Sequence, residues 1–208
     1  MTPEEAKDAS QVRLSLAGIP VNPNLPLLDS FPDLTPRSAC EVASRAFTMS
    51  YIVGISFGDS ASETLERIRK DGLEEHLTPN EKIFLTKSSY SEQDRNWAYW
   101  HGESVLSCAW AMNLIVFDPF KDAPDNLADL FWGELVVPKN QIALASLRPF
   151  NEIYQEADFH YRLHWAVRSW RAHDLPFEIS ELLVAARRRA FDWIIGVPEE
   201  WDDVSLDT

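Results

Sequence analysis

The chain has 208 residues, of which 45% are hydrophobic, and its 33 acidic residues outnumber the 19 basic ones to give a formal net charge of −14. This size and composition exclude a chain disordered throughout and suit one domain with a sizeable apolar core. The charge argues against nucleic acid and anionic membranes as partners, because both are bound through clustered Lys and Arg. A basic protein would be attracted to such a surface. The alternative, that the charge only keeps the protein soluble, stays open.

The sequence also predicts the compartment. Cys40 and Cys108 are the two cysteines, too few for a disulfide framework. The N-terminus lacks the basic region and apolar run of a signal peptide, and no stretch approaches the roughly 18 apolar residues of a membrane span. We therefore expect a cytoplasmic protein without a membrane segment.

The first third of the chain is predicted to be an arm followed by helices. Residues 3–17 can form a short polar helix, and the four prolines from Pro20 to Pro32 then impose extended chain. Apolar residues among these prolines indicate an arm, residues 1–34, laid across a single helical domain of residues 35–208.

Three helix starts follow within fifty residues. Thr35 precedes a proline at the first helical position, which predicts a helix from that point. Ser60-Ala-Ser-Glu63 and Thr78-Pro-Asn-Glu81 are capping boxes, in which the side chains of the first and last residue bond each other's backbone N–H. These signals favour a mainly α fold.

The centre of the predicted bundle is a helix over residues 91–116. Tryptophans such as Trp97, Trp100 and Trp110 and several aliphatic residues cover every side of it, and a helix that is apolar all round is normally buried. Residues 117–148 are less regular, with a short helix near 125–132 and one short β hairpin near 134–147 as the alternative to irregular chain. Two further helices are predicted for residues 149–173 and 176–195.

Glu103 lies within the predicted central helix. A lone carboxylate in an apolar interior is costly unless it is paired, and the basic residues of the last two helices, including Arg189, are the available partners. Trp201 and Val204 also indicate that the acidic tail is anchored, with its aspartates reaching arginines. The predicted polar network consists of Glu103, Arg162, His164, Arg187, Arg188, Asp202 and Asp203.

The sequence gives no positive sign of catalysis. His160 and His164 have a spacing that can place two imidazoles on one metal, but Tyr161 stands where a metalloprotease motif has Glu, and no third ligand is evident. The chain has neither a Gly-x-Ser-x-Gly motif nor a phosphate-binding glycine loop. We expect no catalytic residue, no metal and no cofactor.

Several motifs resemble a known family. Trp100-His101-Gly102-Glu103 followed by Ala109-Trp110-Ala111 resembles the Trp-Arg-x-Glu…Leu-Trp-Ala-Leu core of domain-of-unknown-function family 4272. Later motifs keep the same order, from Arg37 to the end: Leu147-Arg148-Pro149, Tyr161-Arg162-Leu163-His164-Trp165, Arg187-Arg188 with Trp193, and Trp201-Asp202-Asp203…Asp207-Thr208. His101 departs from the pattern, which has Arg. The resemblance implies an α-helical bacterial domain, no catalytic residues, and an accessory or immunity-type role.

These observations together favour a non-enzymatic protein-binding domain, and in particular an immunity protein that neutralises a basic bacterial toxin. The expected contact surface is acidic and comprises Asp118, Asp122, Asp125, Asp129, Glu134, Glu152 and Glu156. Two alternatives stay open: an enzyme of unrecognised type with a pocket formed by Glu103, Arg162 and His164, and a structural subunit of an oligomer.

Overall fold

A computed structural model of the chain describes residues 1–171, 179–197 and 200–207. Within these ranges the regular structure is helical, which confirms the predicted mainly α fold. The α-helices are α1 Pro3–Leu16, α2 Ala39–Ser56, α3 Ala61–Lys70, α4 Pro79–Phe84, α5 Glu92–Ala111, α6 Leu127–Trp132, α7 Pro138–Leu144, α8 Phe150–Arg171 and α9 Glu181–Ile195. None of them is both long enough and apolar enough to cross a membrane.

The chain divides into two compact units. The first contains Met1–Arg37 and Arg148–Thr208, and the second contains Ser38–Leu147. The N-terminal segment thus belongs with the C-terminal helices. The predicted division into an arm of residues 1–34 and a domain of residues 35–208 stays a prediction.

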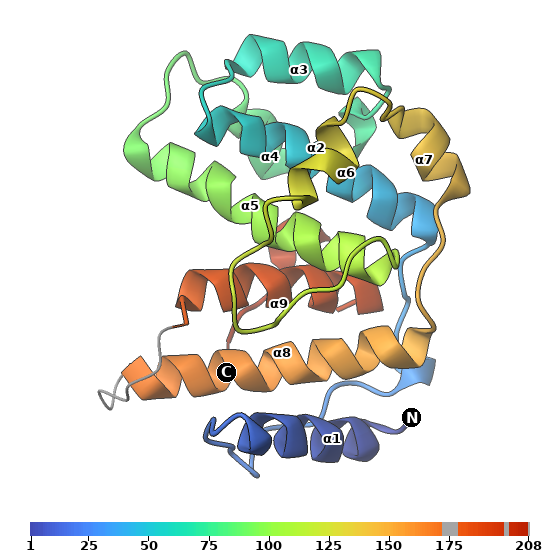
Figure 1. The fold of residues 1–208 in the computed structure, drawn as a ribbon, viewed down its shortest axis with the longest axis vertical. Helices are drawn as coiled ribbons and strands as arrows, with labels where there is room; N and C mark the ends of the chain where they lie inside the picture. The colour runs from blue at the N-terminus through green and yellow to red at the C-terminus, as the bar shows by residue number, and fades with distance from the viewer. Residues whose placement is uncertain (172–178, 198–199, 208) are drawn as a thin grey trace. The chain divides into compact units, whose positions relative to one another are not determined.

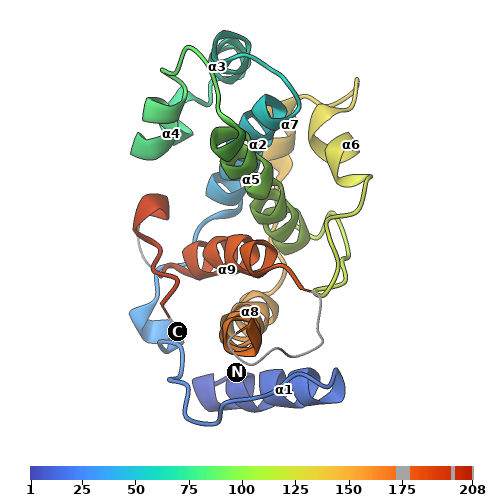
Figure 2. The ribbon, with the colours of Figure 1, turned by 90° about the vertical axis from the view of Figure 1, so that its left-hand side faces the viewer.

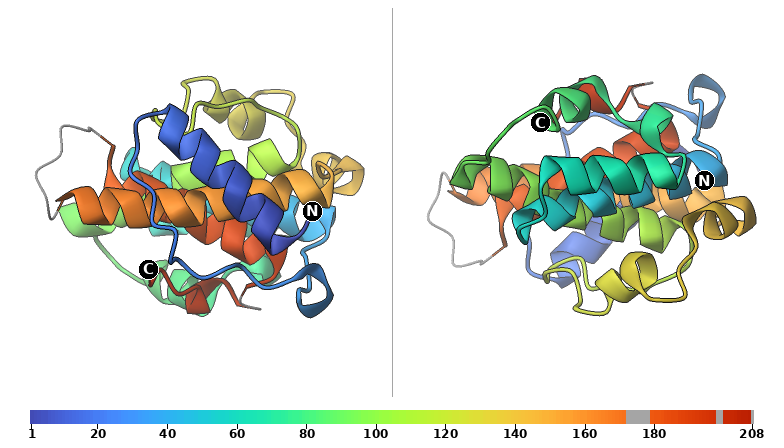
Figure 3. Two further views of the ribbon diagram at one scale, coloured as in Figure 1. Left: turned by 90° about the horizontal axis from the view of Figure 1, so that it is seen from below. Right: turned by 90° about the horizontal axis from the view of Figure 1, so that it is seen from above.

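In the first unit, α8 passes between α1 and α9 (Figures 1 and 2). The predicted helix over residues 3–17 is confirmed as α1, which crosses α8 obliquely (Figure 3, left). Polar contacts fix this crossing: Arg13 of α1 donates to Glu156 of α8 at 2.6 Å, and Gln155 donates to the carbonyl of Ala6 at 3.1 Å.

In the second unit, α5 packs along α2, and α3 and α7 also contact α2 (Figure 1). The capping boxes predicted at Ser60 and Thr78 are confirmed at the starts of α3 and α4. The helix start predicted at Thr35 is wrong. Ser38 is the N-cap of α2 instead, because its side chain and that of Glu41 form a capping box three residues further along.

The predicted central helix is confirmed as α5, with two differences. It ends at Ala111 rather than near 116, and Asn113 follows with a left-handed φ of 59°. Its burial is also uneven, since Trp97 and Tyr99 are exposed at 38% and 47% whereas the turn around Leu106 is fully buried. The apolar pattern therefore overstated burial in the first half of the helix, where aromatic residues face outward.

The β hairpin predicted near 134–147 is wrong, because α7 occupies the middle of that segment with Pro138 at a first-turn position. The short helix near 125–132 is confirmed as α6. Of the two C-terminal helices, α9 begins after the N-cap Ser180. The parts predicted over residues 172–173 and 176–178 lie outside the described residues.

Candidate functional site

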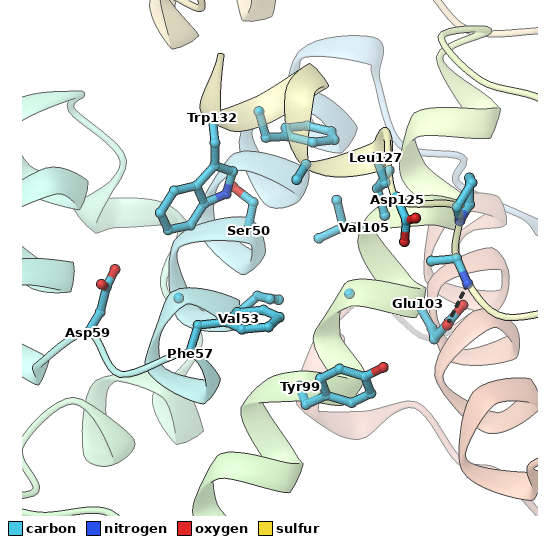
Figure 4. Close-up of a pocket in the computed structure, with 16 residues that line it drawn as sticks. Ser50, Val53, Phe57, Asp59, Tyr99, Glu103, Val105, Asp125, Leu127 and Trp132 are labelled. Carbon is cyan, nitrogen blue, oxygen red and sulfur yellow. Dashed lines mark hydrogen bonds between the residues drawn. The ribbon is translucent and has the colours of Figure 1, made fainter. Parts of the chain in front are cut away.

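A cavity of about 470 Å³ lies in the unit Ser38–Leu147 (Figure 4). The end of α2, the middle of α5 and the segment through α6 form its walls. Gly54 makes this arrangement possible, because a Cβ at that position would lie 2.7 Å from the ring of Trp132. The absence of a side chain therefore lets the Trp132 indole close the cavity against α2.

Aromatic side chains form much of the cavity wall. Phe57, Tyr99 and Trp132 are exposed at 78%, 47% and 41%, and Phe131 supports the wall from the core, packing edge-on against Phe47 at 5.1 Å. Concave, largely apolar sites of this size are typical of ligand pockets, and exposed aromatic clusters mark binding surfaces. The cavity is therefore the candidate functional site.

Three carboxylates line the same cavity, and among its described lining residues there is no Lys, Arg or His. Glu103 is 5% exposed, as expected, and its Oε1 accepts a hydrogen bond from the backbone N–H of Ala123 at 3.1 Å. Asp59 pairs with Arg67 at 2.6 Å, and the Arg67 guanidinium lies 5.1 Å from the centre of a Trp132 ring. Asp125 is exposed at the rim. The lining thus combines apolar walls with negative charge.

The other predicted members of the polar network lie in the first unit, where Arg162 and Arg188 pair with Asp158 and Asp192. Arg162 donates to Asp158 through Nε and Nη2 at 2.8 and 2.9 Å. Arg188 donates to Asp192 at 3.1 Å and to His164 Nδ1 at 2.9 Å. Sequence reasoning missed both aspartates, although each stands four residues from its arginine, a spacing that brings helix side chains together.

Arg187 is fully buried, and neither Arg162 nor His164 is among the residues that line the Glu103 cavity. The predicted pairing of Glu103 with the basic residues of α8 and α9 stays a prediction.

The acidic tail is anchored, as expected, but Arg188 binds its backbone. The Arg188 Nη2 donates to the carbonyl of Asp207 at 3.1 Å, and Trp201 is buried with its ring 5.5 Å from that of Trp193. Asp202 is half-buried and Asp203 is exposed.

Burial shifts the pKa of several groups away from their ordinary values. It lowers the pKa of His160 to about 3, and together with Arg188 it lowers the pKa of His164 to about 4. Burial raises the pKa of Asp192 to about 7, against the opposing effect of Arg188. It also raises the pKa of the Cys108 thiol to about 12, so this cysteine is protonated at neutral pH and unsuited to act as a nucleophile.

These shifts predict how stability depends on pH. A histidine with a lowered folded pKa contributes stability above its unfolded pKa of about 6.5, and that contribution is lost as the pH falls toward the folded value. An aspartate with a raised pKa acts in the opposite direction, losing stability as the pH rises from about 4 to 7. Between pH 6.5 and 4.5, the stability that the two histidines lose on acidification exceeds the stability that Asp192 gains. Acidification is therefore expected to lower the free energy of unfolding.

The variant His164→Gln tests this balance. Arginine only donates, so His164 Nδ1 must be the acceptor, and protonation of that nitrogen breaks the bond. A glutamine oxygen accepts from Arg188 without titrating. The slope of unfolding free energy against pH is expected to fall by about 1.4 kcal/mol per pH unit in urea titrations from pH 4.5 to 6.5. An unchanged slope would contradict the assignment.

Each of the two histidines considered as metal ligands has its Nδ1 atom in a hydrogen bond: His164 Nδ1 with Arg188, and His160 Nδ1 with the carbonyl of Glu156 at 2.9 Å. Within the described residues, no group of three or more His, Cys, Asp or Glu side chains is placed to hold a metal ion.

The predicted acidic contact surface is divided between the two units. In the second unit, all the predicted contact residues are exposed: Asp118, Asp122, Asp125, Asp129 and Glu134. Asp118 forms an ion pair with Lys121 at 3.0 Å. In the first unit Glu152 is exposed and lies 3.4 Å from Arg148. Glu156 was expected on a helix surface, and this is wrong, because it is only 7% exposed and bonded to Arg13.

Comparison with known protein families identifies a match. The family model for a domain of unknown function, DUF4272, matches residues 6–204. The match confirms the resemblance seen in the sequence and extends it from about residue 37 through most of the N-terminal segment. The curated proteins and the solved structures gave no match.

Proposed function

We propose that this chain, which belongs to the DUF4272 family of domains of unknown function, is a protein-binding domain for a basic partner. In its specific form, the proposal is a cytoplasmic immunity protein that neutralises a bacterial toxin. The acidic, aromatic surface around α6 would receive the partner.

One observation carries the proposal: exposed carboxylates and exposed aromatic rings occur together around α6. Five acidic residues lie between Asp118 and Glu134, and Lys121 is the one basic residue in that stretch. Trp132 is exposed in the same segment, and Phe57 and Tyr99 line the adjoining cavity. Protein interfaces are enriched in aromatic residues, and a negative surface favours a positive partner.

The rate of association supports the proposed toxin-neutralising role. An inhibitor must bind before its target does damage, and complementary charge accelerates association at low salt by orders of magnitude. A net charge of −14 supplies the long-range attraction, and the exposed aromatic side chains supply the apolar contact that would slow dissociation.

The proposal is tested by co-expressing the chain with the product of the adjacent gene. We expect a stable complex, and relief of growth inhibition when that product is toxic. If no complex forms and toxicity is unchanged, the immunity role is rejected for that partner.

A charge-neutralising variant tests the surface itself. The triple variant Asp122→Asn, Asp125→Asn, Asp129→Asn removes three exposed charges around α6. It is expected to slow association with the partner about tenfold at low salt, with the difference shrinking as salt is added. The matched control, Glu4→Gln, Asp8→Asn, Glu66→Gln, removes the same charge from exposed positions on α1 and α3. Equal slowing by the two triples, measured by stopped-flow, would contradict a specific surface.

A further inference from the structure

We propose that the cavity beside α6 receives one segment of the basic partner, in which a large aromatic side chain is flanked by Lys or Arg. The aromatic side chain would enter the cavity as an anchor, and the basic side chains would contact the exposed carboxylates next to it. Recognition of this kind rests on the proposed function, because it assigns a chemistry to the same partner and the same surface.

The cavity suits an aromatic side chain. Its volume of about 470 Å³ lies within the range of sites that enclose drug-sized molecules, so a large side chain fits. Its walls carry the rings of Phe57, Tyr99, Phe131 and Trp132. Aromatic rings attract one another in tilted and edge-on arrangements, beyond the effect of buried area alone. Glu103 is already only 5% exposed, so an entering side chain covers little of its carboxylate.

The exposed ring of Trp132 is held in place by its own unit. Its side chain is 41% exposed, yet the Tyr51 ring lies edge-on to it at 5.9 Å and the Arg67 guanidinium lies 5.1 Å from a Trp132 ring centre. Arg67 is in turn paired with Asp59 at 2.6 Å. A wall that is ordered in advance loses less conformational entropy on binding, which favours the capture of an anchor residue.

Charge is unevenly distributed around this cavity. Figure 4 shows Asp59 and Asp125 on opposite sides of it. The charge of Asp59 is balanced by Arg67, whereas Asp125 is exposed and forms no ion pair with a described residue. The segment that carries Asp125, residues 122–134, contains four acids and no Lys or Arg, and all four are exposed. Basic groups of the partner are therefore attracted to this side of the cavity.

A chain segment uses both features at once. Asp125 lines the cavity, but Asp122 and Asp129 are exposed residues outside its lining. A cation held within the cavity would leave these two carboxylates in water, whereas residues that flank an anchor along a chain can reach across the rim. An anchor residue in a pocket with a polar rim around it is also the usual organisation of protein interfaces.

Gly102 provides a variant that fills the cavity. It lines the cavity from within α5, and a Cβ built on it meets no atom within 4 Å. Gly102→Leu would therefore place a side chain in the space of the anchor. Both Leu and Ala favour a helix more than glycine does. Gly102→Ala is thus the matched control, which changes the helix in the same direction and leaves most of the space open.

The experiment titrates three peptides into the whole chain at low salt by isothermal titration calorimetry. The first is acetyl-Gly-Lys-Arg-Trp-Arg-Lys-Gly-amide, the second has Ala in place of Trp, and the third has Gln in place of every Lys and Arg. We expect the first peptide to bind about tenfold more tightly than either of the others. Gly102→Leu should lower its affinity to that of the Ala peptide while the melting temperature is maintained, and Gly102→Ala should bind as the unaltered chain does.

The exposed carboxylates are tested with the triple variant Asp122→Asn, Asp125→Asn, Asp129→Asn. It should weaken the basic Trp peptide about tenfold at low salt and leave the affinity for the Gln peptide unchanged. The control triple on α1 and α3 should weaken the basic peptide less. Equal effects of the two triples would overturn the role of these carboxylates.

Other results would also overturn the proposal. These are equal affinity for the Trp and Ala peptides, no binding of the Trp peptide, or unchanged binding by Gly102→Leu. The peptide comparisons need no variant, so they decide the question even where Gly102→Leu lowers stability. Binding of N-acetyltryptophanamide as tight as that of the Trp peptide would assign the cavity to a free small molecule. Self-association that Gly102→Leu abolishes, measured by sedimentation, would assign it to a second copy of this chain.

Failure of the peptides and failure of the protein partner are distinguishable. Peptide binding with the expected pattern, but no complex with the product of the adjacent gene, rejects that partner and upholds the recognition chemistry. A stable complex whose affinity Gly102→Leu leaves unchanged upholds the proposed function and overturns the role of the cavity in it.

Discussion

Replacing Arg45 by methionine is expected to lower the free energy of unfolding by about 3–5 kcal/mol, because it leaves a buried carboxylate without its guanidinium. Arg45 of α2 and Glu81 of α4 are 3% and 1% exposed, and Nη1 donates to Oε2 at 2.7 Å while Nη2 binds Oε1. Burial opposes ionisation of Glu81, but Arg45 and His101 outweigh it and hold the pKa of Glu81 below its ordinary value. Without Arg45, the burial effect would dominate.

Two further variants identify the cause of this loss. The double variant Arg45→Met, Glu81→Gln has no buried charge at this site. Its glutamine oxygen can still accept a hydrogen bond from the Thr78 backbone N–H, which lies 2.9 Å from Glu81 Oε2. This double variant should therefore be more stable than Arg45→Met alone. Arg69→Met breaks an exposed pair, Arg69 with Glu74 at 3.1 Å, and should cost at most about 1 kcal/mol. Urea unfolding measures all three, and similar losses for Arg45→Met and Arg69→Met would contradict the account.

The Glu81 site also separates what the sequence predicts from what it does not. The capping box with Thr78 is a contact between residues three apart, so it could be predicted from spacing alone. The pairing with Arg45 joins residues 36 apart on different helices and has no local pattern. The start of α2 was predicted wrongly although its signal is also local: Thr35 and Ser38 both carry N-cap signals, and only Ser38 has a Glu three residues later.

The candidate site was predicted only in part. The apolar pattern around Glu103 indicated a buried carboxylate, and its burial is confirmed. Glu103 accepts a hydrogen bond from the backbone N–H of Ala123, and a backbone donor leaves no signature in residue type. The cavity could not be predicted, since it depends on how Phe57, Tyr99 and Trp132 from three separate elements converge.

Long-range pairing also explains the error at Glu156. Its position on a helix with other acids suggested an exposed side chain, but Arg13, 143 residues away in the sequence, lies against it and the two form a part-buried ion pair. By contrast, Asp158 with Arg162 and Arg188 with Asp192 are spaced by four on single helices and could have been predicted.

Gly196→Ala is expected to destabilise the protein by about 2–5 kcal/mol, through two additive effects. Gly196 ends α9 with a φ of 93°, a left-handed conformation that costs an L-residue about 1–2 kcal/mol. A Cβ there would also collide with the backbone of Thr35, lying 2.6 Å from its carbonyl carbon, and such overpacking costs about 1–3 kcal/mol. The Thr35 backbone has little freedom to withdraw, because the neighbouring Arg37 N–H donates to the Ile194 carbonyl at 2.9 Å.

Gly18→Ala isolates the first of these effects. Gly18 has a φ of 73° in the same unit, and a Cβ built on it meets no atom within 4 Å. This variant should therefore lose only the conformational part, about 1–2 kcal/mol. Thermal and urea unfolding of the two variants side by side measures the difference, which is the contribution of the Thr35 contact. Equal losses for Gly18→Ala and Gly196→Ala would mean that the close approach of Thr35 to the end of α9 does not constrain the folded chain.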